Sequence, residues 1–264
     1  MTSSRDVLDC FVVRSETARR LFDNWTTDPS KRDVVPVVMA HVTAVPYAAT
    51  VAQLIEVCRE TEHALGNARR SVGESVEPIR DWHPDFAFTH VMHFVTERLG
   101  EVPTYQRFRE FCGADPDGQR MLYVPAKRAI EEAAQRGYDV RAAREAMRWR
   151  IGNAYYSFIR EVHVLAVLRE AGVLLQIHPL ADALFRVDAW IDDIVLALYV
   201  GNARYRRGED GRKPTAHSLL ADSIPAFRFH SLELPTQHSY GDVHLAGPES
   251  LDAAIARLRG LLPT

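Results

Sequence analysis

Residues 194–200 read Ile-Val-Leu-Ala-Leu-Tyr-Val, a run without a single charge between Asp192-Asp193 and Gly201. A short apolar run that is rich in β-formers and bounded by turn residues is typical of a strand buried on both faces of a sheet. Such a strand needs other strands beside it and helices above and below it. The segment therefore excludes an all-helical fold and predicts a unit that contains both helices and strands.

The flanking sequence supplies the expected neighbours. An amphipathic pattern over residues 154–171 predicts a helix that Gly172 ends. Further elements are predicted at 173–178 (strand), 183–191 (strand), 216–222 (helix), 227–234 (strand), 243–247 (strand) and 248–263 (helix). The order helix, strand, strand, strand, helix, strand predicts an α/β unit in which a three-strand meander is followed by a crossover.

The first half of the chain reads as helices. Apolar residues recur with a helical period over 5–25 and 36–67, with Pro46 as a break in the second segment. Residues 70–84 predict a loop, and further helices are predicted over about 85–99, 103–113 and 121–136, with Asp139 capping the next one. We therefore predict a helical domain over residues 1–138 and an α/β domain over residues 139–264.

The composition limits the compartment and the chemistry. Among 264 residues there is no run of about 18 uncharged apolar residues and no signal-peptide pattern at the start. The three cysteines are widely spaced, which predicts a reduced, cytoplasmic setting and no membrane partner. Of the 32 basic residues 29 are arginine, so chemistry that needs a lysine has only Lys31, Lys127 and Lys213 to draw on.

The net charge of −3 conceals a basic middle segment. Residues 1–140 carry 17 basic and 21 acidic side chains, whereas residues 141–213 carry 12 and 9. Nucleic-acid binders concentrate positive charge where they contact phosphates. The middle segment leans towards such a footprint, although a solvated helix face explains a net charge of +3 equally well.

Two acids stand at informative places in the second half. Glu161 lies in the predicted helix, and Asp188 lies inside an otherwise apolar strand, where a lone carboxylate is costly without a partner. Together with the order of elements, this pattern resembles the PD-(D/E)XK superfamily of restriction-endonuclease-like nucleases. The resemblance covers about residues 150–264 and implies an αβββαβ domain. It also implies a helix glutamate, a strand aspartate and an acid-x-Lys pair around one or two Mg²⁺ or Mn²⁺ ions.

The sequence departs from the superfamily pattern at its most diagnostic point. The third strand, 194–200, contains neither an acid nor a lysine. The resemblance implies Glu161 and Asp188 as metal ligands and catalytic residues, with Lys213 as a displaced catalytic lysine. Arg204 is a second displaced candidate, and Asn202 is a possible neutral ligand. Asp192 and Asp193 fall in the turn between two strands, away from where such a site forms.

An arginine-rich loop follows the third strand. It contains Arg204, Tyr205, Arg206, Arg207, Arg212 and Lys213, and basic residues around an aromatic ring suit phosphate contact and base stacking. Arg148, Trp149 and Arg150 could extend the same surface. The loop therefore predicts contact with DNA, and the alternative is an ordinary solvent-exposed connection.

Other arrangements leave alternatives open. Asp188 could pair with Arg186 or Arg204, and Glu161 with Arg160 or Arg169, as structural salt bridges. His90, His93 and Glu97 share one helix face with a spacing that suits a divalent ion, and Glu60 and His63 form a Glu-x-x-His pair. For both groups, ordinary hydrogen bonding is the more common role.

These observations predict a DNA-associated protein with a helical N-terminal domain and a catalytically degenerate, restriction-endonuclease-like C-terminal domain. The resemblance suggests a setting in phage defence, restriction or a mobile element. One alternative is an active Mg²⁺-dependent DNA nuclease that uses Glu161, Asp188 and Lys213. Another is a protein–protein scaffold or regulator, with a protein partner or a second copy of the chain and no nucleic acid.

Overall fold

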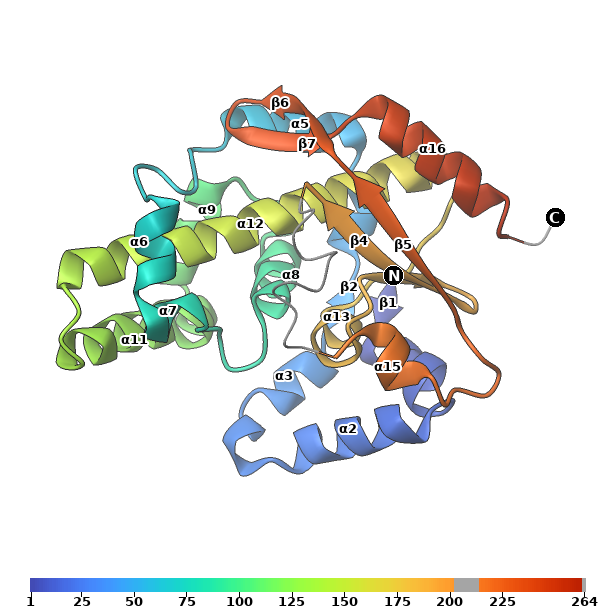
Figure 1. Cartoon of the computed structure of the whole chain (residues 1–264), viewed down its shortest axis with the longest axis horizontal. Helices are drawn as coiled ribbons and strands as arrows, with labels where there is room; N and C mark the ends of the chain where they lie inside the picture. The colour runs from blue at the N-terminus through green and yellow to red at the C-terminus, as the bar shows by residue number, and fades with distance from the viewer. Residues whose placement is uncertain (202–213, 263–264) are drawn as a thin grey trace.

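A computed structural model describes residues 1–201 and 214–262, which form a mixed α+β fold with helices as the main element (Figure 1). The longest helix, α12 (Val140–Glu170), runs through the middle of the molecule. It begins as the sequence predicts, because the Asp139 side chain accepts a hydrogen bond from the Ala142 N–H at 2.9 Å. The mixed class is confirmed, and the specific restriction-endonuclease-like fold stays a prediction.

The segment before α12 consists of short helices and one very small antiparallel sheet, β1 (Thr2–Ser3) with β2 (Val42–Thr43). Its first helices are α1 (Ser4–Val7), the π-helix η1 (Leu8–Val12), α2 (Glu16–Thr27), the 3₁₀ helix η2 (Pro29–Lys31), α3 (Val35–Met39), α4 (Val45–Ala48) and α5 (Val51–Glu60). The later ones are α6 (Arg70–Ser75), α7 (Glu77–Arg80), α8 (Phe88–Leu99), α9 (Tyr105–Ala114), α10 (Pro116–Gly118), the π-helix η3 (Gln119–Tyr123) and α11 (Val124–Gln135).

The segment after α12 builds the main sheet. Strand β3 (Ala189–Ile191) pairs antiparallel with β4 (Ile194–Val200), and β4 pairs parallel with β5 (Arg228–Leu234). Helix α15 (Ala216–Leu220) lies in the connection between the parallel strands. A hairpin of β6 (Thr236–Tyr240) and β7 (Val243–Ala246) and the terminal helix α16 (Pro248–Arg259) complete the chain. The strands predicted at 194–200, 227–234 and 243–247 are confirmed.

The strand predicted over residues 183–191 is wrong in its first half, where the chain forms helix α13 (Pro179–Phe185). Pro179 suits the first turn, and the His178 side chain accepts a hydrogen bond from the Leu180 N–H at 3.1 Å, so the helix has a strong start. Arg186 ends it in the left-handed conformation, with φ 61°. The apolar run is therefore divided between a helix and β3.

Two other segments also differ from expectation. Residues 173–178 form no regular strand, but Gln176 makes a single antiparallel bridge to Trp190 of β3. Residues 70–84, predicted as a loop, contain α6 and α7. Gly73 allows α6 to pack closely against Trp149 of α12, since a Cβ there would lie 2.3 Å from the Trp149 ring.

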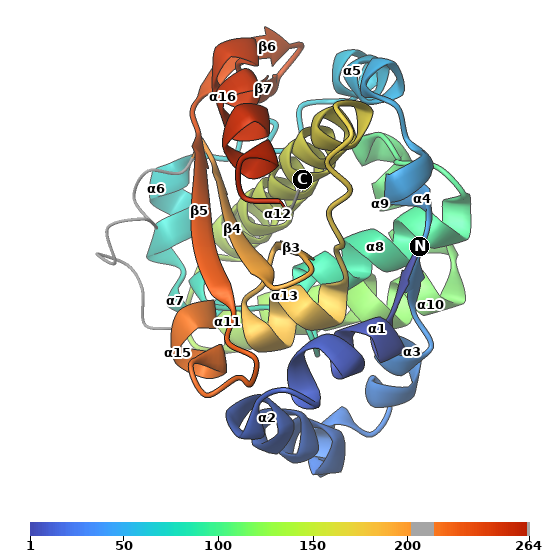
Figure 2. The same cartoon turned by 90° about the vertical axis from the view of Figure 1, so that its right-hand side faces the viewer.

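Helix α12 organises the hydrophobic core. It contacts β4 and α16 on one side and α5 and α8 on the other (Figure 2). Three of the apolar clusters take buried residues from both sides of residue 139, and one of them joins Phe11 of η1 to Phe185 and Trp190. The division into domains at residue 139 stays a prediction, and the site described next lies where the two segments meet.

Candidate functional site

Glu161 and Asp188, the two acids singled out by the sequence, line one small cleft beside α12. The cleft, hereafter the acidic cleft, is formed by α8, α12, α13 and the residues that flank α13. Its lining residues are Thr89, His93, Phe158, Glu161, Val162, Leu165, Ile177, His178, Asp182 and Asp188. Its free volume of about 10 Å³ is room for about one water molecule. The fold thus brings together residues that lie 27 positions apart in the chain.

Two hydrogen bonds to strand β4 fix the position of Asp188, the residue directly before β3. Its N–H donates to the Leu196 carbonyl at 3.2 Å, and its Oδ2 accepts a hydrogen bond from the Leu198 N–H at 2.6 Å. Both partners belong to β4, so the carboxyl group is held against the central strand. Helix α13 places a third acid, Asp182, in the same cleft. The sequence offered no signal for Asp182, because the segment reads as a strand and its turn.

Burial and neighbouring carboxyl groups raise the pKa of Glu161 and Asp188. Burial is the largest cause for Asp188, and with the nearby charge of Asp182 it raises the pKa from 3.8 to about 8. Burial, then Asp188 and then Asp182 raise the pKa of Glu161 well above 4.5. Strongly perturbed acids in a cleft are a common sign of a functional site.

The salt-bridge alternatives are not formed among the described residues. Arg160 donates to the carbonyl of His244 at 2.9 Å, and Arg169 donates to backbone carbonyls of residues 46, 47 and 49. Arg186 makes no ion pair with Asp188 and lowers the pKa of that carboxyl less than burial and Asp182 raise it. Among the described residues, neither Glu161 nor Asp188 has a cationic partner at ion-pair distance, and both line the cleft together with Asp182.

The other residues considered as candidates for a site fall into three groups. Lys213, Arg204, Tyr205, Arg206, Arg207, Arg212 and Asn202 lie outside the described residues. Asp193 pairs with Arg228 at 2.8 Å in the β3–β4 turn, away from the cleft. Arg148 and Arg150 donate to the carbonyls of Ala64 and Trp82, so both side chains hold the helical segments together.

A buried group of histidines adjoins the acidic cleft. His41 is its centre, with ring centroids of His178, His93 and His90 at 5.2, 5.8 and 6.0 Å. The Thr43 hydroxyl lies 3.2 Å from His41 Nε2 and 3.4 Å from His93 Nδ1. His93 and His178 also line the cleft, so imidazole and carboxyl groups lie along the same cavity. The sequence pointed to His90 and His93 but gave no reason to place His41 and His178 beside them.

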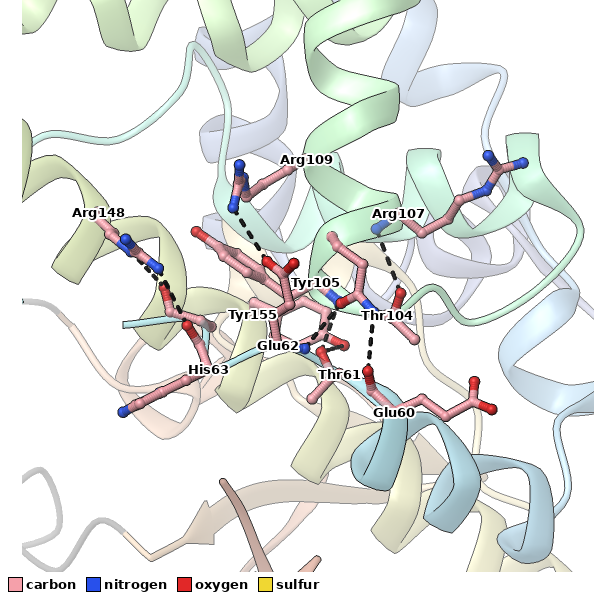
Figure 3. A network of polar contacts seen from close by, with 12 residues as sticks. Glu60, Thr61, Glu62, His63, Thr104, Tyr105, Arg107, Arg109, Arg148 and Tyr155 are labelled. Atoms are coloured by element: carbon pink, nitrogen blue, oxygen red, sulfur yellow. Dashed lines mark hydrogen bonds and ion pairs between the residues drawn. The ribbon is translucent and has the colours of Figure 1, made fainter. Parts of the chain in front are cut away.

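The metal-like spacings serve other purposes. Glu97 Oε1 accepts hydrogen bonds from the N–H groups of Ala44 and Val45 at 2.7 and 2.9 Å, so it caps the start of α4. Glu60 and His63 point away from each other in the network that joins α5, α9 and α12 (Figure 3). His63 Nδ1 lies 2.9 Å from the Tyr156 hydroxyl.

The histidine group predicts a pH-dependent stability. Burial lowers the pKa of His41 to about 2, of His90 and His93 to about 3 and of His178 to about 4, from 6.5. Below pH 6.5 the unfolded chain binds more protons at these sites, so they favour unfolding increasingly as the pH falls. We expect each to contribute a loss of up to about 2 kcal/mol near pH 5, measured by urea unfolding.

The matched test compares His41→Gln with His238→Gln. His41 is the centre of the group, and the charged groups that act on it and its neighbours are the other three histidines, Asp6 and Arg120. The stability difference between wild type and His41→Gln should shrink from about pH 7.5 to about pH 5. His238 is exposed on β6, and its variant should show a constant difference. Equal pH dependence of the two variants would contradict the prediction.

Carboxylate oxygens are the ligands that Mg²⁺ and Mn²⁺ prefer, and the acidic cleft contains three such groups. Yet in residues 1–201 and 214–262 no three His, Cys, Asp or Glu side chains are placed to hold one metal ion. As the side chains stand, the residues present do not fit the metal that the resemblance implies.

No described helix is both long and apolar enough to cross a lipid bilayer.

Comparison with known proteins identifies no relative. No family model matches the chain, and no significant match is found among curated proteins or solved structures.

Proposed function

We propose that this chain is a DNA-associated protein whose C-terminal part is restriction-endonuclease-like and catalytically degenerate. The observation that carries the proposal is the convergence of Glu161 and Asp188 in one cleft beside the central strand. These are the two residues that the superfamily resemblance selects, and convergence was not guaranteed by their positions in the sequence.

The pairing of the strands supports the same reading. The bridge between Gln176 and Trp190 and the β3–β4 pair are antiparallel, whereas the β4–β5 pair is parallel after a crossover that contains α15. These pairings agree with the meander and crossover of an αβββαβ unit, except that a single bridge stands where its first strand would be and helix α13 follows that bridge. The long helix before the meander carries Glu161 towards the sheet, as the resemblance implies.

Three features favour loss of cutting over its retention. Strand β4 offers only apolar side chains and Tyr199 where the resemblance requires an acid and a lysine. The acidic cleft has room for about one water molecule, which is too little for a phosphodiester. Among the described residues, Lys31 donates to the Asp85 carbonyl and Lys127 lies 4.0 Å from Glu131, so neither lines the cleft.

An active Mg²⁺-dependent nuclease is the second candidate, and Asp182 is the observation that favours it. This third acid lines the cleft with Glu161 and Asp188, so it would replace the strand carboxylate that β4 lacks if the three side chains moved to hold one ion. The reading also needs Lys213 or another group from outside the described residues.

DNA binding is tested by mobility shift at about 50 mM salt, where phosphate contacts are strongest. The double variant Arg206→Ala/Arg207→Ala should weaken binding about tenfold, because it removes two positive charges from the proposed contact loop. The control Arg107→Ala/Arg109→Ala removes the same charge from α9, where both arginines already face Glu110 and Glu62, and should change binding less than about threefold.

The same preparations are incubated with supercoiled DNA and Mg²⁺ or Mn²⁺. DNA that stays intact supports the hypothesis that the nuclease-like site is catalytically degenerate. Metal-dependent nicking that disappears in Asp188→Ala overturns it and supports the active nuclease, whereas an unchanged rate in Asp188→Ala excludes Asp188 from cutting. If the wild type binds no DNA even at low salt, the proposed association with DNA is wrong and a protein–protein scaffold is favoured.

A further inference from the structure

A second pocket lies in the helical part of the molecule and shares no lining residue with the acidic cleft. It is formed between the α7–α8 connection and the segment from α10 to α11, and α7 packs beside α11 (Figure 1). Its volume of about 610 Å³ is within the range of small-molecule sites. The side chains that define its chemistry are Trp82, Asp85, Gln119, Arg120, Arg128 and Glu132.

Trp82 provides a fixed aromatic wall. Its ring is half-buried and packs edge-on against Phe88, with centroids 5.6 Å apart and an interplanar angle of 73°. Arg150 of α12 donates to the Trp82 carbonyl at 2.6 Å, which fixes the backbone as well. A ring held in this way at a pocket wall suits stacking with a planar base, because little side-chain freedom is lost on binding.

Two guanidinium groups provide positive charge in the same pocket. Arg120 lies on η3 and is held by Asp117 at 3.0 Å. Arg128 lies on α11 and has no ion pair or hydrogen bond with another described residue. Arginines recognise phosphate through paired hydrogen bonds. The π-helical turn of η3 adds to the case, because such turns are frequent at binding sites.

Two carboxylates complete the lining. The side chains of Asp85 and Glu132 face the pocket without a hydrogen-bond or ion-pair partner among the described residues. Carboxylates bind sugar hydroxyls, as in dinucleotide sites where an acid accepts from the ribose. They also repel a chain of several phosphates, so the balance of two acids and two arginines favours a ligand with a single phosphate.

We infer that this pocket binds a ribonucleoside 5′-monophosphate. The base stacks on Trp82, the ribose hydroxyls donate to Asp85 and Glu132, and the phosphate accepts from Arg120 and Arg128. This site is independent of the acidic cleft and of the proposed contact with DNA, so either conclusion can fail without the other.

Isothermal titration of the full chain with AMP, GMP, CMP and UMP tests the inference. At least one should bind, and Arg128→Ala should weaken its binding about tenfold, because one guanidinium contact to phosphate is lost. Arg136→Ala is the matched control at the end of the same helix, exposed and outside the pocket, and should bind as the wild type does. Unfolding midpoints of both variants establish that each is folded.

A second pair of variants tests the sugar contact. Glu132→Ala should reduce the preference for a ribonucleotide over its 2′-deoxy form, whereas Glu131→Ala, the neighbouring exposed acid outside the pocket, should not. The inference is overturned if no monophosphate binds, if Arg128→Ala binds with unchanged affinity, or if inorganic phosphate binds as tightly as the nucleotide. Equal binding of the nucleoside without phosphate would overturn it as well.

Discussion

Asp188→Asn is expected to raise the free energy of unfolding at neutral pH by about 1–4 kcal/mol. Burial and the charge of Asp182 raise the pKa of the Asp188 carboxyl from 3.8 to about 8. At pH 7 the carboxyl is ionised in the unfolded chain and must bind a proton when the protein folds, which lowers the stability of the wild type. Asparagine carries no charge to bury. Its amide oxygen still accepts the hydrogen bond that the Leu198 N–H donates at 2.6 Å.

The sign of the effect depends on pH. Between pH 3.8 and about 8 the folded protein binds more protons at Asp188 than the unfolded chain does, so this group lowers the stability of the wild type as the pH rises. The advantage of Asp188→Asn should therefore be small near pH 4 and largest near pH 8. The groups that act on this carboxyl are Asp182 and Arg186, with Glu161 as the other acid of the cleft.

Urea unfolding at several pH values measures this advantage. Asp192→Asn is the control, because Asp192 is exposed in the β3–β4 turn at φ 52°, a conformation that asparagine accepts. It should change the stability by less than about 0.5 kcal/mol at every pH. A variant at Asp188 that is less stable than the wild type throughout, or a difference that does not vary with pH, would show that the carboxyl is not destabilised as described.

Divalent cations distinguish the two readings of the acidic cleft in the same experiment. A degenerate cleft predicts that Mg²⁺ and Mn²⁺ leave the unfolding midpoints of wild type and Asp188→Asn unchanged. A cleft that binds metal predicts a midpoint that rises with cation concentration in the wild type and not in the variant, because a ligand of the folded state stabilises it by mass action.

The sequence predicted most of the C-terminal architecture because its strands are encoded locally. Residues 194–200 have no helical period and no charge, so β4 was unambiguous. The error at 183–191 arose because one apolar run serves two elements, and the decisive signal was the His178–Pro179 pair that starts α13. The strand expected at 173–178 reduces to one bridge, since its backbone groups pair with β3 only at Gln176.

The sequence could predict a site residue only where a residue type is unusual for its place in the predicted fold. Asp188 stood out as an acid in an apolar run, and Glu161 followed from the resemblance. Asp182, His41 and His178 have no such mark, because each reaches the site through tertiary packing of α13 and the N-terminal segment against α8 and α12. No local sequence pattern predicts that those elements pack against one another.

The basic middle segment is a second case in which tertiary contacts decide the role of residues that the sequence singles out. Its charge suggested a footprint for nucleic acid, yet the described arginines Arg148, Arg150, Arg160 and Arg169 of α12 each donate to a backbone carbonyl of another segment. Carbonyl partners leave the charge uncompensated while they fix the side chain. Positive charge on α12 is therefore used to attach neighbouring elements, and the case for DNA contact depends on the loop after β4.

Arg169→Ala is expected to lower the free energy of unfolding by about 2–3 kcal/mol. Its guanidinium donates to the carbonyls of Pro46, Tyr47 and Ala49, the bond to Pro46 being 3.2 Å long. These carbonyls end helix α4, so the side chain satisfies acceptors that the helix itself leaves open. Removing a charged donor from several partly buried acceptors leaves them without partners, which is more costly than losing one exposed bond.

Arg169→Lys and Arg141→Ala separate this role from a loss of charge. Lysine keeps the charge but cannot match the planar fork of donors, so it should recover less than half of the loss. Arg141 is exposed in the first turn of α12, and its variant should change the stability by less than about 0.5 kcal/mol. If Arg169→Ala unfolds at the same urea concentration as Arg141→Ala, the contacts to α4 do not stabilise the fold. If it is destabilised as expected, an arginine of the basic segment is a structural link between α12 and the N-terminal helices.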